Sequence, residues 1–169
     1  AYVFDARSGQ ELKKLTGSHT HPTASFGFPL VVQGAELLVG ARDEDDEGVD
    51  RSGAVYHFNL HTGTELRRFS SDHPALRSAF GFRIAVSEQR LLISVPGDAA
   101  FFTDLGRVEM YDLRTGARLG AFEPADNAEG DLFGYPIAMD GCRAVVGSSW
   151  DDDLGDETGS AYIFLLPQD

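Results

Sequence analysis

Short runs in which apolar and polar residues alternate recur along the whole chain. In Ala54–Phe58, Val55 and His57 fall on one face of an extended backbone and Tyr56 and Phe58 on the other, which is the period of a β-strand. No window has the spacing of an amphipathic helix. With 19 glycines and 7 prolines available for turns, the pattern predicts an all-β protein of short strands.

The strands belong to an internal repeat. A Phe-Gly pair occurs three times, and its phenylalanines, at positions 26, 80 and 133, lie 54 and 53 residues apart. Each pair is followed by an apolar run and then by a strand that starts with glycine. The apolar runs are Leu37–Ala41, Leu91–Val95 and Ala144–Ser148, and the glycine-led strands are Gly53–Phe58, Gly106–Tyr111 and Gly159–Phe164, with Ala1–Phe4 as a further copy. The period is about 53 residues.

Each repeat predicts four short strands. In the first complete repeat these are Phe26–Val32, Glu36–Gly40, Ala54–Phe58 and Glu65–Phe69. A tight turn joins the first two strands, and a loop that ends at Gly63 joins the last two as a hairpin. We place the repeats near residues 1–23 (third and fourth strands only), 24–77, 78–130 and 131–169 (first to third strands).

Four antiparallel strands at a fixed period predict the blades of a β-propeller. We interpret residues 1–169 as a single propeller segment of about three and a half blades. A β-sandwich is the main alternative for an all-β chain of this length, but it does not account for the regular repeat.

The repeated sequence resembles the FG-GAP repeat. The features that carry the resemblance are the Phe-Gly pair, an apolar strand ending in Val-Gly-Ala at Val39–Ala41, an acidic loop, and Gly-Ser-Ala-Tyr-Ile-Phe at Gly159–Phe164. The middle repeat departs from the pattern, with Ser94 in place of the glycine. FG-GAP repeats build the seven-bladed propeller of integrin α-subunits and of many bacterial surface proteins. The resemblance therefore implies part of a seven-bladed ring, located outside the cell or on its surface.

The turns between the first and second strands differ from those of integrins. Many integrin repeats carry an acidic calcium loop there, whereas this chain has Gln33-Gly34, Glu88-Gln89 and Gly141-Cys142. These turns are too short and too poor in carboxylates to surround a calcium ion with oxygen ligands. The chain is therefore similar to the calcium-poor bacterial branch of the family.

The predicted blades do not complete a ring. The chain has the third and fourth strands at its N-terminal end, two full repeats, and three strands at its C-terminal end. Either the chain is part of a longer propeller, or two copies form a dimeric ring through their open edge strands. A third strand is present at both ends, so a simple head-to-tail join would have one strand too many.

The composition narrows the choice of partners. The formal net charge is −13, which disfavours nucleic-acid binding because such sites need a basic surface. No apolar run is long enough to cross a membrane. The single cysteine, Cys142, excludes an internal disulfide. A protein partner or a second copy of the chain remains as the expected binding partner.

The acidic residues concentrate in the loops between the second and third strands, at 42–50, 98–104 and 150–157. The carboxylates that could bind calcium are Asp43, Asp45, Glu47, Asp151, Asp153 and Asp156. The alternatives are a solvated acidic surface and a catalytic pair of carboxylates. Basic residues fall on the predicted outermost strand and indicate a basic rim: Lys13, Lys14, Arg67, Arg68 and Arg118.

Large aromatic residues also occur in these loops. Phe101, Phe102 and Trp150 either pack beneath the loops or form an exposed binding site for a protein or a sugar. No catalytic, phosphate-binding or zinc motif is present. The sequence therefore predicts a noncatalytic module for protein binding, adhesion or scaffolding, with no certain cofactor. A carbohydrate-binding lectin and an accessory part of a larger extracellular enzyme are the alternatives.

Overall fold

The computed structural model of the chain describes residues 1–97, 105–126, 128–153, 155 and 158–167. Within these residues the chain forms four antiparallel sheets. Their strands are β1 (Tyr2–Phe4) and β2 (Glu11–Lys14); β3 (Leu30–Gln33), β4 (Glu36–Ala41), β5 (Ala54–Asn59) and β6 (Glu65–Phe69); β7 (Ile84–Ser87), β8 (Arg90–Val95), β9 (Arg107–Asp112) and β10 (Arg118–Phe122); and β11 (Phe133–Asp140), β12 (Arg143–Ser148) and β13 (Ser160–Leu165). This confirms the predicted all-β class and the order of the strands.

The beginning of the first predicted strand is wrong. We expected a strand from Phe26, but β3 begins at Leu30. Ser25 and Gly27 both have positive φ angles, of 54° and 114°, so the backbone turns sharply at the Phe-Gly pair and cannot run as a regular strand there. The amide of Gly27 instead donates a hydrogen bond to the carbonyl of Gly40, at 3.0 Å.

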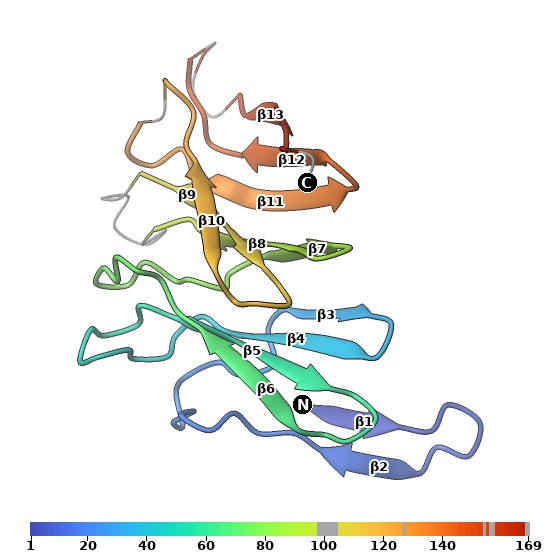
Figure 1. Cartoon of the computed structure of the whole chain (residues 1–169). Coiled ribbons are helices and arrows are strands. Elements are labelled where there is room, and N and C mark those ends of the chain that lie inside the picture. The colour runs from blue at the N-terminus through green and yellow to red at the C-terminus, as the bar shows by residue number, and fades with distance from the viewer. Residues whose placement is uncertain (98–104, 127, 154, 156–157, 168–169) are drawn as a thin grey trace.

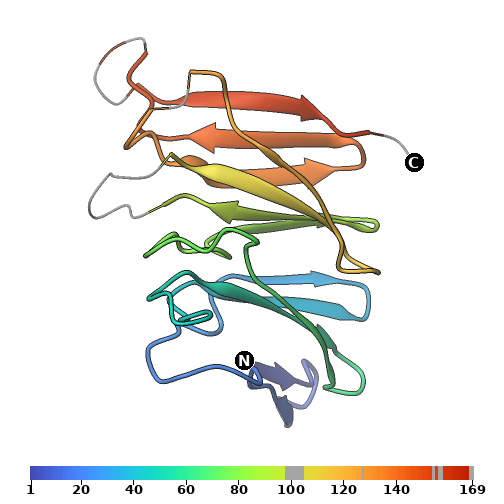
Figure 2. The same ribbon diagram turned by 60° about the vertical axis from the view of Figure 1, so that its left-hand side comes forward.

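The four sheets are stacked in chain order along the molecule (Figure 1). Neighbouring strands within each sheet follow one another in sequence, and the first strands of successive sheets meet, β3 against β7 and β7 against β11. Turning the molecule by 60° shows the same order of layers (Figure 2). Four-stranded meanders that stack face to face around shared inner strands are the blades of a β-propeller, and this chain is a segment of one.

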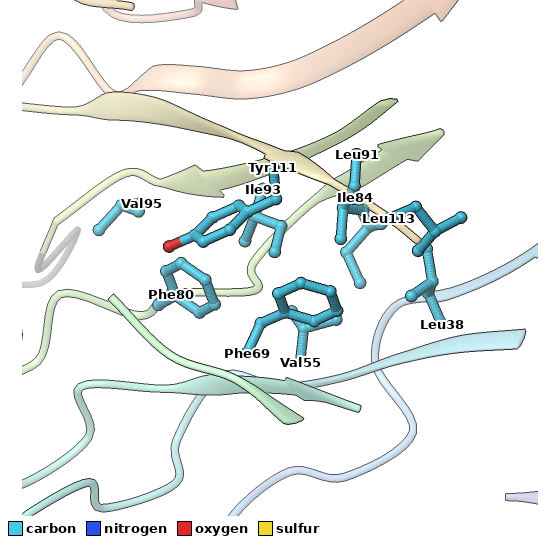
Figure 3. Close-up of a cluster of buried hydrophobic side chains, with 10 residues drawn as sticks. All are labelled: Leu38, Val55, Phe69, Phe80, Ile84, Leu91, Ile93, Val95, Tyr111 and Leu113. Carbon is cyan, nitrogen blue, oxygen red and sulfur yellow. The ribbon is translucent and has the colours of Figure 1, made fainter. Parts of the chain in front are cut away.

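The hydrophobic core lies between the sheets. One cluster joins the β3–β6 sheet to the β7–β10 sheet; Figure 3 shows Phe69 and Phe80 facing Tyr111 across this junction. A second cluster joins β1 and β2 to the β3–β6 sheet, and a third joins the β7–β10 sheet to the β11–β13 sheet. The β3–β6 and β7–β10 sheets each bury both faces against different neighbours, whereas each sheet at an end of the stack has one face that no other sheet of the described residues covers.

The Phe-Gly pair forms the joint between successive sheets. Phe80 is fully buried, and its backbone forms a parallel bridge with Gly53 of the preceding sheet. A Cβ atom on Gly53 would collide with the backbone of Phe80, and a Cβ atom on Gly106 would collide with that of Phe133. The glycines before β5 and β9 are therefore required by the close approach of the next Phe-Gly segment.

Among the residues that the structure describes, no helix has the length and apolar character needed to cross a membrane.

Candidate interaction surface

A buried carboxylate fixes the loop that follows β4. The side chain of Glu44 has no exposed surface. Its oxygens accept hydrogen bonds from the Tyr56 hydroxyl at 2.9 Å and from Nε of Arg68 at 2.9 Å. Burial, together with the neighbouring carboxylate, raises the pKa of Tyr56 above its ordinary value. The contact ties the loop to β5 and β6, so Glu44 is an anchor and not part of an exposed acidic surface.

The β7–β10 sheet contains a second buried carboxylate, Glu109 on β9. It accepts hydrogen bonds from Tyr111 and Ser71, each at 2.7 Å, and forms ion pairs with Arg107 at 2.9 Å and Arg118 at 3.4 Å. Burial alone would raise the pKa of Glu109, but these hydrogen bonds and the Arg107 charge hold it below its usual value. The group is therefore an ionised part of the junction.

The β11–β13 sheet has the same kind of anchor, made by Asp151. This carboxylate is 2% exposed and accepts a hydrogen bond from the Tyr162 hydroxyl at 2.8 Å. That bond is the main reason why the pKa of Asp151 is lowered. Asp151 follows β12 by three residues, as Glu44 follows β4. Unlike Glu44 and Glu109, it has no arginine beside it among the residues that the structure describes.

The last sheet presents an apolar face to solvent. Its exposed large side chains are Val145 on β12 and Ile163 and Leu165 on β13, and we call them the C-terminal face. Val145 is 42% exposed, whereas the residues at the same position of the other two repeats, Leu38 and Leu92, are 2% and 0% exposed. Those two leucines lie in the clusters that bind the following sheet.

A cavity of about 440 Å³ opens on the C-terminal face. Its lining includes Tyr135, Pro136, Val145 and Ala161. Val55 and Val108, which correspond to Ala161, are completely buried against the next sheet. The C-terminal face is therefore built as one side of a junction between sheets, and it is open in this chain.

The opposite end of the stack carries the complementary face. Tyr2, Phe4 and Leu12 of β1 and β2 are exposed, and we call them the N-terminal face. Tyr2 is 54% exposed, whereas Tyr56, at the same position of the next repeat, is 0% exposed. Val3 between them points the other way, into the core shared with the β3–β6 sheet. The N-terminal face thus corresponds to the side that each sheet turns toward the preceding one.

Residues 119–164, from within β10 to within β13, match the family model of the FG-GAP repeat. The chain carries an FG-GAP repeat. The matched segment contains the Phe-Gly joint at Phe133, the buried Asp151 and all of β13 except its last residue, Leu165. The β3–β6 and β7–β10 sheets have the same order of strands as one another, and we refer to each sheet as a repeat unit. The family resemblance seen in the sequence is confirmed.

The chain also resembles solved structures in its fold. A chain in a crystal structure of the mitotic checkpoint complex superposes with a TM-score of 0.60 at 17% sequence identity, over 88% of this chain and 37% of that chain. At this identity the likeness concerns the fold alone. This chain thus spans 37% of the length of the structure that it matches. A search of curated protein sequences finds no significant match.

Among the described residues, the carboxylates proposed as calcium ligands form no group of three that could hold a metal ion. Asp43 accepts a hydrogen bond from the Ser25 hydroxyl, and Asp45 accepts one from the amide of Arg51 at 3.0 Å. Glu47 is exposed. Of the second set, Asp151 is buried against Tyr162, Asp153 is exposed, and Asp156 lies outside the described residues. Across the described parts of the chain, no three carboxylate, His or Cys side chains converge on one point, and calcium binding stays a prediction.

Of the three large aromatic residues that the sequence places in these loops, Trp150 lies in the described part of the chain. Trp150, just after β12, is 39% exposed, while Phe101 and Phe102 lie outside the described residues. A different aromatic set, not predicted from the sequence, directly follows each Phe-Gly pair: Phe28, Phe82 and Tyr135. Their rings meet edge to face, at 6.4 Å and 5.3 Å between centroids.

Arginine side chains complete this aromatic row. The guanidinium of Arg83 lies 4.7 Å from the ring centroid of Phe82 and 4.4 Å from that of Tyr135, and Arg42 lies 4.8 Å from Phe82. Such cation–π contacts stabilise the line along which the first strands meet. The recurrence of an aromatic residue two positions after the phenylalanine of each pair was the signal that could have revealed the row.

Proposed function

We propose that this chain is a noncatalytic protein-binding module whose main binding surface is the C-terminal face. The observation that carries the proposal is the exposure of Val145, Ile163 and Leu165 at positions whose counterparts are used elsewhere in the chain to bind another sheet. Exposed contiguous apolar side chains on a rigid sheet are typical of a protein-interaction site. The buried carboxylates support a noncatalytic role, because Tyr and Arg side chains already occupy their oxygens.

A second copy of the chain is the partner that fits this surface. Within the stack, the side of one sheet that carries Leu38 binds the side of the next that carries Tyr111. The C-terminal face corresponds to the side that carries Leu38. The N-terminal face of another copy corresponds to the side that carries Tyr111. Their contact is heterologous, so it extends the stack and closes into a ring where the rotation per sheet allows.

Sedimentation equilibrium tests this proposal. We expect the purified chain to show an average mass above 18.3 kDa that rises with concentration. Val145→Asp and Phe4→Asp, one on each face, should each return the mass to that of a monomer, because a charge buried in an apolar contact costs several kcal/mol. Leu76→Asp is the matched control, since Leu76 is 62% exposed in a loop away from both faces.

Circular dichroism and thermal melting would establish that each variant is folded. A wild-type chain that stays monomeric at every concentration would contradict the proposal. Equal association of the wild type and both face variants would also contradict it.

A further inference from the structure

A cavity of about 510 Å³ lies at the junction of the β3–β6 and β7–β10 sheets, apart from the C-terminal face. The first sheet contributes Glu36, His57, Leu66 and Arg67 to its lining, and the β9–β10 turn contributes Leu113 and Arg114. Leu113 belongs to the buried cluster drawn in Figure 3. Each of the two sheets is covered by a further sheet on its other face, so the cavity does not depend on the open ends of the stack. Its volume is in the range of small-molecule binding sites.

His57 is a polar side chain at a core position of the junction. The same position of the register holds Met110 and Ile163 in the next two sheets. His57 is 4% exposed. Its Nε2 atom lies 3.1 Å from Oε2 of Glu36, off the line of a hydrogen bond, and makes no hydrogen bond to any described residue. A buried polar atom without a hydrogen bond is costly, and Met110 shows that a junction can be built without it.

Two arginines bring positive charge to the cavity. Arg67 lies directly opposite His57 in the register of β5 and β6, so both side chains are on the face that the next sheet covers. Nη2 of Arg67 donates to the carbonyl oxygen of Arg114 at 3.4 Å, which places its guanidinium across the junction. Among the described residues, neither arginine forms an ion pair with a carboxylate. Of the described residues that line the cavity, Glu36 is the one with a carboxylate, so positive charge is in excess.

The cavity also has an apolar wall beside these charges. Leu113 is buried, and Leu66 is about half exposed. An organic anion with an apolar body fills such a site better than an inorganic ion does, because apolar surface and a few polar groups are used together. The planar guanidinium of an arginine matches the two oxygens of a carboxylate.

We propose that this cavity binds a small organic carboxylate, whose oxygens pair with Arg67 and His57 and whose apolar body lies against Leu66 and Leu113. Arg114 adds positive charge beside the bound group. The site is separate from the C-terminal face and needs no partner chain, so it goes beyond the protein-binding function.

Protonation of His57 couples this binding to pH. Burial is the main cause that lowers the pKa of His57; Arg67 lowers it further, and the adjacent Glu36 opposes the shift. The imidazole is therefore neutral at pH 7. The charged groups that line the cavity with it are Glu36, Arg67 and Arg114. A carboxylate bound beside the imidazole favours its protonated form, so the affinity should rise as the pH falls from about 8 to about 5.5.

Phenylacetate is a suitable probe, because it joins a carboxylate to an apolar ring, and phenylacetamide is its uncharged counterpart. In a heteronuclear NMR titration we expect phenylacetate to shift the amide signals of Leu66 and Leu113 and to reach saturation at millimolar concentration. Phenylacetamide and inorganic phosphate should each bind at least about tenfold more weakly. No saturable binding of phenylacetate, or equal binding of either comparison compound, would overturn the proposal.

Variants of the chain test the assigned residues, with thermal melting to establish that each is folded. Arg67→Gln should weaken phenylacetate binding about tenfold, the loss typical of one charged hydrogen bond, while Arg143→Gln, on an exposed arginine of β12, should not. His57→Met places there the residue type that β9 carries, so the variant should be at least as stable as the wild type and should lose the pH dependence of binding.

Equal losses for the two arginine substitutions, or a pH dependence that His57→Met leaves unchanged, would overturn the proposal. Val145→Asp, which should abolish self-association, should leave phenylacetate binding intact. Failure of the proposed function and failure of this inference are therefore distinguishable.

Discussion

At the scale of single residues, the junctions between sheets depend on ionised side chains that are removed from water. Glu109 is the clearest case, because it is 1% exposed and is held by Tyr111, Ser71 and Arg107. A carboxylate whose pKa is lower in the folded than in the unfolded chain stabilises the fold at pH values above its unfolded pKa. That contribution disappears as the pH falls through the lowered value.

Glu109→Gln should therefore be less stable than the wild type at pH 7, and the difference should shrink as the pH falls below about 4. Urea unfolding at a series of pH values measures the free energy of unfolding of both proteins. Glu123→Gln, on an exposed residue, is the control and should follow the wild type throughout. A wild-type advantage over Glu109→Gln that is the same at pH 3 and pH 7 would contradict the assigned ionisation.

Sequence patterns located these charges without revealing what they do. The acidic loops predicted a solvated or metal-binding surface, yet Glu44 and Asp151 are buried because Tyr56 and Tyr162 reach them from the third strand. The basic fourth strands predicted an outer rim, but Arg68 turns inward to Glu44. Burial of a charge depends on partners from separate strands, and alternation within one strand cannot show it.

At the scale of strands and sheets, the repeat predicted most of the architecture. Alternation and turn residues are local, so they identified the strands and their order correctly. The one wrong element, the start of β3, lies where positive φ angles at Ser25 and Gly27 redirect the backbone. That conformation follows from docking on the neighbouring sheet, as the Gly53–Phe80 bridge illustrates for the next unit, and it has no counterpart in the hydrophobic pattern.

Gly106→Ala tests the importance of this docking. The added methyl group would collide with the backbone of Phe133, so the two sheets must separate or shift, and we expect a loss of about 1–3 kcal/mol in the free energy of unfolding. Gly120→Ala in β10 is the control, because its methyl group would meet no atom within 4 Å. Chemical denaturation of both variants makes the comparison, and equal stabilities would contradict the role given to the joint.

At the scale of the whole molecule, apolar end faces coexist with a net charge of −13. Two copies therefore repel each other at long range while their end faces attract at contact. Salt screens the repulsion, with a Debye length of about 10 Å at 0.1 M, and leaves the apolar contact in place.

Self-association through the two end faces should therefore strengthen when sodium chloride is raised from about 50 mM to about 500 mM. Sedimentation equilibrium at the two salt concentrations measures this change. Association that weakens with salt would show that charged contacts, and not the apolar faces, hold the copies together.

The stacking of sheets in chain order also determines how stability is distributed along the chain. Among the described residues, the buried clusters between sheets join only sheets that follow one another in the chain. The free energy of opening is therefore close to a sum of local terms. The β3–β6 and β7–β10 sheets share a cluster of ten buried residues, and each is covered by a neighbouring sheet on either side. The terminal sheets have one junction each and open at lower cost. The two end faces thus lie on the parts of the molecule that exchange most readily between closed and open states.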